Sequence, residues 1–349
     1  MTFMHDEQQG YFSDIVGDDA NCGELRIVVL GTGGAGCNTV NRLGKTGLSN
    51  TDFIACNTDV QDLRKIQGNV QKLLIGFEST KGLGAGGYPE KGAESAKLSK
   101  HEIRQALDGT NLLFLCAGMG GGTGTGSAPV IAEIAKDLGA VVVSVVSYPF
   151  KMERSRMKKA EEGILRLQKN SDTVIVVDNN KLIEYVPHLP IDRAFLVADE
   201  IVARAVSGIT QTLKEPSLIN LDFADLRSIL CGGNLSVICV GDGEGKNRVE
   251  DSVRNTLTHP LLDVDFKGAS GALIHISGGP DLCLREANQV GDLIVNEFDE
   301  KANIIWGARV KPNLENRLEL ITVASGVHRK TLFKTIEVPE EDEFRLSRL

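Results

Sequence analysis

Short apolar runs alternate with longer amphipathic segments through the first half of the chain. These β-rich runs occupy residues 25–30, 70–75, 112–116, 140–146 and 173–177, and another strand-like run precedes Asp59. Between them, apolar residues recur at three- and four-residue steps, which is typical of helices. Strands that are apolar throughout and alternate with helices predict a parallel sheet covered on both faces. We therefore expect a Rossmann-like α/β domain over residues 24–191.

A long central helix is predicted next, over residues 192–215. Its apolar residues recur at helical spacing, Pro190 precedes it and Pro216 ends it. Beyond it, strand-like runs lie at 235–240, 272–276, 303–310 and 318–324, with a helix near 281–298. This pattern predicts a smaller α/β domain over residues 216–327. Residues 1–23 are polar and predict a flexible arm, and residues 328–349 predict an acidic tail.

Composition excludes several classes of protein. The chain has 349 residues, 42% of them hydrophobic, and a net charge of −9. This charge disfavours a nucleic-acid binder, which needs a dense Lys/Arg face. The longest apolar run, residues 140–146, is too short to span a membrane, so no direct membrane insertion is expected. Seven scattered cysteines without a CxxC pair indicate reduced thiols and a cytoplasmic location.

The six histidines show no metal-ligand spacing such as HExxH. We therefore expect them to be surface or loop residues and predict no structural zinc site.

The first candidate site is a glycine-rich loop that follows the first predicted strand. It runs from Gly31 to Asn38 and a helix follows; its residues include Gly33, Gly34, Ala35, Gly36, Cys37 and Asn38. Glycines allow the backbone to approach a ligand closely, and a helix N-terminus offers free N–H groups to an anion. Taken alone, this is the G-x-G-x-x-G pattern of dinucleotide-binding enzymes. A nicotinamide oxidoreductase therefore remains an alternative at this point. Asp59, after the next strand-like run, lies near the sequence distance at which that pattern has an acidic residue.

A second glycine-rich loop follows the strand at 112–116. It contains Gly120, Gly121, Gly122, Thr123, Gly124 and Thr125, and the helix after it is expected at 128–138. Two such loops at neighbouring strand ends would enclose one polyphosphate, with threonine hydroxyls as extra donors. A third loop, residues 82–87, includes Gly86 and would close the pocket near the terminal phosphate. Since a dinucleotide needs only the first loop, the set of three favours a nucleoside triphosphate.

One apparent motif is set aside. Gly44-Lys45-Thr46 resembles the end of a P-loop, but Thr39 stands where that motif has glycine. The segment also follows a predicted helix instead of a strand. The phosphates are then held mainly by backbone amides and a metal ion.

The glycine run 120–126 resembles the signature of the tubulin/FtsZ family of GTPases, and residues 117–138 are similar to its FtsZ branch. Further matches are Asn57-Thr58-Asp59, the segments 82–90 and 160–163, and residues 220–225. The resemblance covers about residues 25–327, and the run 304–308 is more similar to archaeal members. It implies a self-assembling GTPase of cell division that binds GTP or GDP with Mg²⁺ and polymerises head-to-tail.

The resemblance also implies roles for individual residues. Residues 34–38 and 122–124 would contact the phosphates, and Asn57, Asp59 and Gly86 belong to matching loops. Glu153 and Arg156 would lie near the ribose. Asn179, Asp199 and a stacking Phe195 would recognise guanine, whose adjacent N1–H and N2–H donors suit a carboxylate. A site built for those donors rejects adenine.

Candidate catalytic residues follow the central helix. If Asp199 touches the base, the helix continues for about 14 residues, about 21 Å, before the loop that carries Asn220, Asp222 and Asp225. These acids would then meet a neighbouring copy's γ-phosphate, where they could orient or deprotonate water. The alternative is that Asn220 and Asp222 simply cap the next helix. With the family resemblance we favour catalysis across a head-to-tail contact, which produces a filament when it does not close.

Several positions depart from the family pattern. Residues 149–156 lack the usual glycine and are one residue shorter, which puts Arg156 in doubt. Tyr88 stands where Asn or Asp is common. The chain is expected at the division site, with a membrane adaptor or division proteins bound through its termini. The remaining alternative is a non-dividing cytoskeletal or scaffold filament of the same fold with weak or no hydrolysis.

Overall fold

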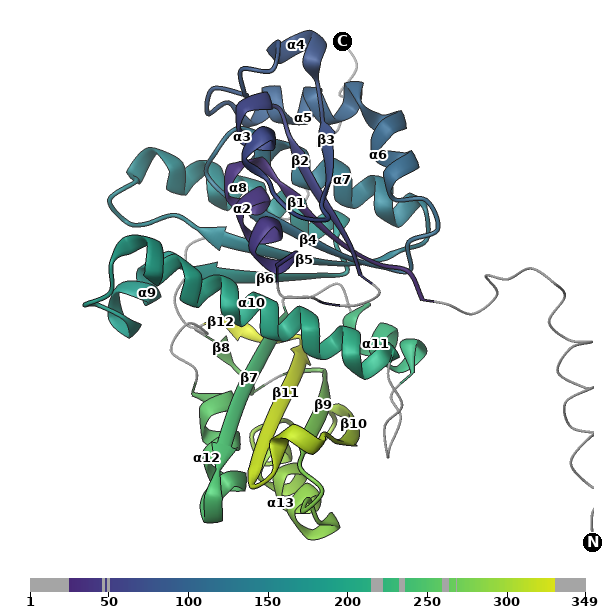
Figure 1. Ribbon diagram of the computed structural model, residues 1–349, viewed down its shortest axis with the longest axis vertical. Helices are drawn as coiled ribbons and strands as arrows, with labels where there is room; N and C mark the ends of the chain where they lie inside the picture. The colour runs from purple at the N-terminus through teal and green to yellow at the C-terminus, as the bar shows by residue number, and fades with distance from the viewer. Residues whose placement is uncertain are drawn as a thin grey trace, which may run out of the picture.

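The computed structural model describes residues 25–45, 48, 51–214, 222–231, 236–258, 264–267 and 269–329. Within these residues, two α/β parts lie on either side of one long helix, α10 (Ile191–Lys214) (Figure 1). The predicted arm, most of the predicted tail and the candidate Asn220 lie outside the described residues. No helix among the described residues is long and apolar enough to cross a membrane.

The larger part is built on a six-stranded parallel sheet. Its strands are β1 (Ile27–Thr32), β2 (Thr51–Asn57), β3 (Gln71–Leu74), β4 (Leu112–Gly118), β5 (Val141–Tyr148) and β6 (Thr173–Asp178). Their order is β3-β2-β1-β4-β5-β6, and every neighbouring pair is parallel. Strands β1 and β4, which precede the first two glycine loops, are therefore neighbours. The sequence predicts this placement of the two loops at neighbouring strand ends.

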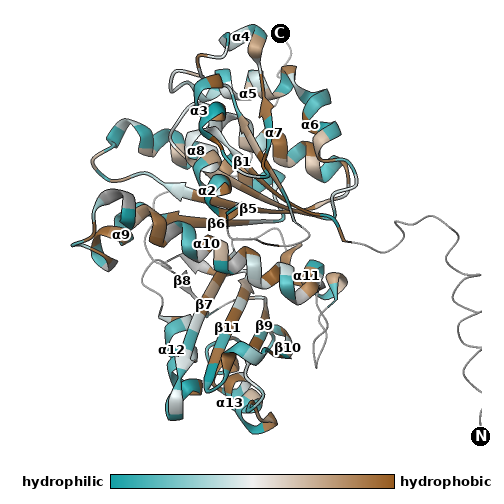
Figure 2. Cartoon of the chain, in the orientation of Figure 1, coloured by the Kyte–Doolittle hydropathy of each residue, from teal (hydrophilic) through white to brown (hydrophobic). Residues whose placement is uncertain are grey.

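Helices cover both faces of this sheet, which explains why strands such as β1 and β6 are buried along their whole length. On one face lie α2 (Gly33–Leu43), α3 (Val60–Lys65) and α10; on the other lie α5 (Pro89–Leu98), α6 (Lys100–Ala106), α7 (Thr123–Asp137) and α8 (Arg154–Asn170). Val29 belongs to the core under the first set and Val28 to the core under the second. The short helices α4 (Phe77–Thr80) and α9 (Asn179–Tyr185) complete this part. Figure 2 shows the strands mostly in the hydrophobic colour.

The smaller part has a mixed four-stranded sheet in the order β10-β9-β11-β7. Its elements are β7 (Ser236–Glu244), α12 (Arg248–Leu257), β9 (Gly271–Gly278), α13 (Leu284–Val295), β10 (Asn303–Val310) and β11 (Arg317–Ser325). Strand β11 is antiparallel to both of its neighbours. A short pair, β8 (Val264–Asp265) and β12 (His328–Arg329), lies apart, so ordered structure extends two residues past the expected boundary at 327. The predicted fold class is confirmed.

Helix α10 joins the two parts through a shared core. Val206 and Ile209 of α10 belong to one cluster of buried residues with Val29 of the large sheet and Ile321 of the small one. Helix α11 (Phe223–Leu230) adds Leu226 and two further residues to the same cluster. Burying apolar side chains against both sheets fixes α10 as a rigid spacer between them.

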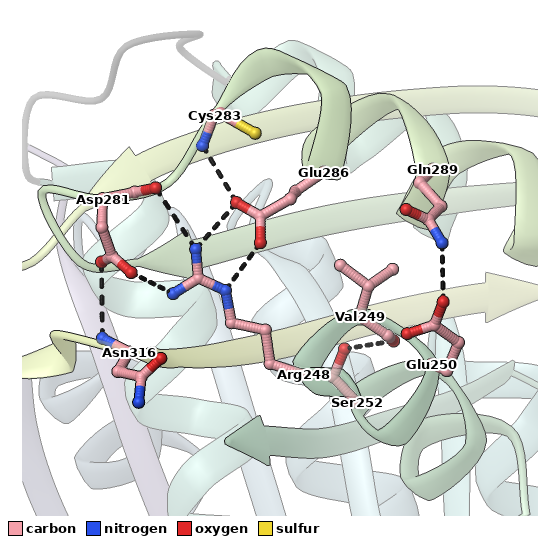
Figure 3. Close-up of polar contacts among 9 residues, drawn as sticks. All are labelled: Arg248, Val249, Glu250, Ser252, Asp281, Cys283, Glu286, Gln289 and Asn316. Carbon is pink, nitrogen blue, oxygen red and sulfur yellow. Dashed lines mark hydrogen bonds and ion pairs between the residues drawn. The ribbon is translucent and has the colours of Figure 1, made fainter. Parts of the chain in front are cut away.

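A buried arginine ties α12 to α13 on the other face of the small sheet. Arg248, whose side chain is 7% exposed, donates to both carboxylate oxygens of Glu286 at 2.7 and 2.8 Å (Figure 3). It also pairs with Asp281, whose other oxygen accepts from the backbone N–H of Asn316 at 3.4 Å. Hydrogen bonding to Arg248 lowers the pKa of Glu286 to about 2. This cluster holds the start of α13 in place.

The histidine expectation is wrong at one position. His275 lies in the middle of β9 and is 3% exposed, and burial lowers its pKa to about 4. A neutral imidazole fits within an apolar strand, and the sequence pattern alone did not distinguish it from a surface residue.

Candidate nucleotide-binding site

A cavity of about 520 Å³ lies at the carboxyl ends of the parallel strands. It is the place where open α/β sheets bind ligands. Most of the predicted site residues line it: Gly33, Gly34, Ala35, Asn38, Asn57, Asp59, Gly121, Gly122, Thr123, Gly124, Glu153, Arg156, Asn179, Phe195 and Asp199. The fold thus brings together residues that are up to 166 positions apart (33 to 199) in one cavity.

The first two glycine loops are themselves the first turns of helices. Helix α2 begins at Gly33 and α7 begins at Thr123, five residues earlier than the helix expected from residue 128. Neither N-cap residue, Thr32 or Gly122, makes a side-chain capping hydrogen bond. The N–H groups of both first turns are therefore available to an anion, and two helix dipoles favour negative charge at this point.

The two helix starts touch each other. Gly33 has a φ of 72°, and a Cβ there would lie 2.7 Å from the backbone nitrogen of Gly124. Only glycine fits this conformation at this distance. Gly44, by contrast, lies at the end of α2 with no strand before it, which removes the P-loop interpretation.

A pair of threonines connects these loops to the residues after β2. The hydroxyls of Thr58 and Thr123 are 2.7 Å apart, and the Thr58 carbonyl accepts from the backbone N–H of Gly84 at 3.2 Å. Asp59 caps α3 by accepting from the N–H groups of Gln61 and Asp62. Gly84, rather than the predicted Gly86, is the residue of the third loop that lines the cavity.

At the other side of the cavity lies Asp199 of α10. One of its oxygens accepts from the Thr39 hydroxyl at 2.7 Å, and the other pairs with the Arg42 guanidinium. Its side chain is 13% exposed. Burial raises the pKa of Asp199, while Thr39 and Arg42 oppose that rise. Each carboxylate oxygen has two lone pairs, so further donors can still bind.

Sequence reasoning missed Thr39 and Arg42, although a signal existed. Both lie in α2, each four residues after a predicted site residue: Thr39 follows Ala35 and Arg42 follows Asn38 on the same helical face. Their partner is 160 residues away in the chain, so the pairing required the fold.

An aromatic pair and an ion pair also line the cavity. The rings of Phe150 and Phe195 pack edge to face with centroids 6.0 Å apart. Glu153 pairs with Arg156 at 2.6 Å and accepts from the backbone N–H of Phe150 at 3.2 Å. The segment that departs from the family pattern therefore still presents Glu153 and Arg156 to the cavity.

Five of the predicted nucleotide-binding residues do not line the cavity, and four of them have visible structural roles. A Cβ on Gly36 would lie 2.3 Å from the Cys116 carbonyl oxygen, so this glycine lets α2 pack on β4. The buried Cys37 thiol donates to the Cys56 carbonyl at 3.3 Å. The remaining pair forms one turn, in which the Gly120 N–H donates to the Thr125 hydroxyl at 2.8 Å. Gly86 has a φ of 60° in the third loop.

The acidic candidates lie far from this cavity within the same chain. Asp222 is the N-cap of α11, and Asp225 completes a capping box with it. Neither residue lines the cavity. In Figure 1, α11 and α9 lie at opposite ends of α10, which spans 24 residues and so about 36 Å. Asp222 is exposed.

Helix α11 lies near the amino ends of the strands of the large sheet. Cys231, the residue directly after α11, is close to Lys136 and Asp172, which precede β5 and β6. Those positions mark the amino ends of the strands, whereas the cavity lies at the carboxyl ends. One copy therefore presents its cavity on one side and its acidic pair on the other.

Comparison with known proteins identifies the family. Residues 26–187 match the tubulin/FtsZ family, GTPase domain, and residues 234–328 match the FtsZ family, C-terminal domain. The cell division protein FtsZ 2 of Methanocaldococcus jannaschii is 56% identical over 87% of this chain and 81% of that protein. The cell division protein FtsZ 1 of Pyrococcus furiosus is 50% identical over 91% of this chain and 85% of that protein.

Solved structures agree with this assignment. An empty FtsZ dimer from M. jannaschii superimposes with a TM-score of 0.82 at 41% identity, covering 97% of this chain and 100% of that one. A CetZ2 protofilament from Haloferax volcanii has a TM-score of 0.74 at 24% identity, covering 88% of this chain and 95% of that one, a likeness of fold alone.

The chain belongs to the tubulin/FtsZ family of GTPases, in its FtsZ branch. The predicted resemblance and the predicted function as a cell-division GTPase that binds GTP and GDP are confirmed at this level. The oxidoreductase interpretation of the first loop is set aside, and the non-dividing alternative is not supported.

Proposed function

We propose that the cavity binds GTP and that hydrolysis takes place where the cavity meets Asp222 and Asp225 of an adjacent copy, together with the predicted Asn220. The observation that carries the proposal is the separation of the two halves of the site. The cavity lies at the carboxyl ends of the strands of the large sheet, whereas Asp222, which is exposed, and Asp225 lie toward the amino ends. A head-to-tail contact between copies would join them.

The orientation of the nucleotide follows from α2. The N-terminus of α2 at Gly33 faces the phosphate side, whereas Asp199 contacts positions 39 and 42, six to nine residues further along. At 1.5 Å per residue this separation is about 9–14 Å, which fits a base at Asp199 and phosphates at the helix start. Asp199 would accept from guanine N1–H and N2–H, with Asn179 and Phe195 beside the base. Glu153 and Arg156, which also line the cavity, would lie near the ribose.

The two acids would act on the attacking water. A carboxylate within hydrogen-bond reach can orient a water molecule or accept its proton. Asp222 and Asp225 both cap α11, but in doing so each carboxylate accepts only one hydrogen bond from a backbone N–H. Their remaining lone pairs stay available to a water beside a neighbour's γ-phosphate.

Mg²⁺ fits the phosphate side of the cavity. No group of three or more His, Cys, Asp or Glu side chains in the described part of the chain could hold a metal by itself. Mg²⁺ usually binds through one or two carboxylates, phosphate oxygens and water. Asp59 and Asp62 line the cavity and would provide that carboxylate contact, and the ion would neutralise phosphate charge.

Repeated head-to-tail contacts would produce a filament in which each junction contains one GTP. Loss of the γ-phosphate would weaken the junction, which couples assembly to hydrolysis. The similarity to cell division proteins favours a role at the division site. Adaptor or division proteins would bind through the terminal segments.

Phosphate release measured across protein concentration, with GTP and with ATP, tests this proposal. We expect turnover per molecule to rise steeply above the concentration at which light scattering reports assembly, and ATP to be a poor substrate. GTP turnover per molecule that is independent of protein concentration would contradict hydrolysis at junctions.

A further inference from the structure

The third glycine loop contributes Gly84 to the cavity lining, and Tyr88 follows it directly. Gly82, Gly84, Gly86 and Gly87 all have positive φ values, between 60° and 84°. Its first half is attached to the residues after β2: the Val60 N–H donates to the Gly82 carbonyl at 3.0 Å, and Gly84 donates to Thr58. Because glycine has high conformational entropy, this loop needs outside contacts to hold one conformation.

The second half of the loop packs against the second glycine loop. A Cβ placed on Gly122 would lie 2.9 Å from both the Ala85 Cβ and the Tyr88 nitrogen. Another cavity, of about 240 Å³, shares no lining residue with the first cavity, and its walls include Tyr88, Lys159 and Arg166. The loop is therefore closely packed on its inner side and open on its outer side.

Lys159 of α8 crosses this open side. Its ammonium donates to the Gly87 carbonyl at 2.7 Å and lies 5.7 Å from the centre of the Tyr88 ring. Tyr88, the residue that departs from the family pattern, thus provides the aromatic face for a cation–π contact. Helix α8 carries Arg156 one turn earlier, and a Cβ on Gly120 would lie 2.8 Å from the Arg156 Cβ. One helix thus supports the ribose side, the second loop and the third loop.

We propose that Lys159 is a positioning residue that holds the third loop against Gly122 and thereby sets the preference for GTP over GDP. This inference rests on the orientation proposed above, and it adds that the last phosphate lies on the side of Thr58, Thr123 and Gly84. A diphosphate ends before it reaches that side. Loosening the loop should therefore weaken binding of the triphosphate and leave binding of the diphosphate almost unchanged.

The test compares Lys159→Met with Lys158→Met. Methionine keeps the apolar stem but removes the charge and the donor, and Lys158 is an exposed neighbour on the same helix that lines neither cavity. Affinities for GTPγS and GDP are measured by calorimetry below the concentration at which light scattering detects assembly. We expect Lys159→Met to lower the GTPγS-to-GDP preference by roughly 5–30-fold, with GDP affinity changed less than about twofold. Lys158→Met should match the wild type.

Rescue and coupling distinguish positioning from general packing. Lys159→Arg keeps both the donor and the cation and should restore most of the preference. Tyr88→Leu should lower it, whereas Tyr88→Phe should not, and the effects of Lys159→Met and Tyr88→Leu should be less than additive. If Lys159→Met fails to fold, Tyr88→Leu and Tyr88→Phe provide the same comparison.

Equal loss of GTPγS and GDP affinity in Lys159→Met, or no change in either, would overturn the role of Lys159. These measurements use unassembled protein, so they do not depend on Asp222 or on filament contacts. The role of Lys159 and hydrolysis at junctions can therefore fail separately.

Discussion

The Oδ1 atom of Asp222 accepts a hydrogen bond of 2.7 Å from the backbone N–H of Asp225, and Asp225 accepts one of 3.2 Å from the N–H of Asp222. The carboxylates proposed to act on a neighbour's GTP are thus also the cap of α11. A substitution that removes the side chain affects both roles, so an informative variant must separate them.

Asp222→Asn makes that separation. Asparagine caps helices about as well as aspartate, but it cannot accept a proton from water. We predict that this variant binds GTP and assembles while its hydrolysis falls by roughly 10²–10⁴-fold. The measurements are steady-state phosphate release and light scattering.

Two comparisons control for stability. Asp222→Ala should also lose about 1 kcal/mol through the lost cap, visible as a lower Tm. Glu300→Gln removes an exposed acid elsewhere in the smaller part and should leave hydrolysis unchanged. Near-normal hydrolysis in Asp222→Asn would leave Asp222 with its capping role only.

Alanine substitutions at Gly34 and Gly36 should have opposite effects on stability. A Cβ on Gly34 would meet only the Asp62 carboxylate at 3.7 Å, whereas one on Gly36 would lie 2.3 Å from the Cys116 carbonyl oxygen. Gly34→Ala should therefore keep the Tm of the wild type. Gly36→Ala should be destabilised by roughly 1–3 kcal/mol because α2 must move away from β4.

Gly34→Asp extends this prediction to the phosphates. The new carboxylate lies in the first turn of α2, where an acid suits the helix dipole, so the fold should keep its Tm. The same carboxylate would repel a phosphate, and we expect GTP affinity to fall at least about 100-fold. Calorimetry and thermal melting check both statements; retained GTP affinity would place the phosphates elsewhere.

Asp199 predicts the base specificity. Asp199→Asn replaces an acceptor oxygen by an NH₂ donor, which opposes the guanine N2–H group. We expect GTP affinity to fall by roughly 10–100-fold and affinity for xanthosine triphosphate, which has a carbonyl at that position, to rise. Competition binding measures both. A parallel loss for both nucleotides would mean that Asp199 acts only through its contacts with Thr39 and Arg42.

Acid stability tests the Arg248 cluster. The pKa of Glu286 is about 2 in the folded chain, below its ordinary value of 4.5. Its contribution is therefore full above about pH 4.5 and is lost as the pH falls toward 2. We predict that Glu286→Gln lowers the free energy of unfolding near pH 7 by on the order of 1–2 kcal/mol. Below pH 4 the difference in unfolding free energy between variant and wild type should become smaller, because Glu286 of the wild type becomes protonated. Denaturant melts across this range measure it.

Glu250→Gln is the matched substitution for that experiment. It changes an exposed carboxylate in the same region, which accepts from the Gln289 amide at 2.8 Å (Figure 3). We expect little change in stability at any pH. A constant difference between Glu286→Gln and wild type at all pH values would contradict the ionic origin of the effect.

Local pattern in the sequence was sufficient for the large sheet and the central helix. The central strands are apolar on both faces because helices cover both, and α10 begins at Ile191, one residue before its predicted start at 192. Helix starts were less accurate at the glycine loops. The pattern placed a helix from residue 128, but α7 begins at Thr123, because the glycines themselves form its first turn.

Side-chain pairing across the chain could not be predicted from local pattern. Thr39 and Arg42 contact Asp199 only because α10 packs beside α2. Within the first turns of α2, Gly34 faces open space near Asp62, whereas Gly36 faces β4. A glycine that contacts a ligand and one that allows close packing look alike in a sequence. The separation of Asp222 from the cavity was foreseeable, since it depends only on the length of α10.

Mixing two inactive variants tests hydrolysis at junctions most directly. Asp222→Asn copies keep an intact cavity, and Gly34→Asp copies keep an intact acidic pair. If the acids of one copy act on the GTP of another, the mixture should release phosphate well above the sum of the separate variants. Replacing the second partner by the double variant, Gly34→Asp with Asp222→Asn, should abolish the gain. A mixture no more active than its separate components would contradict hydrolysis across the junction.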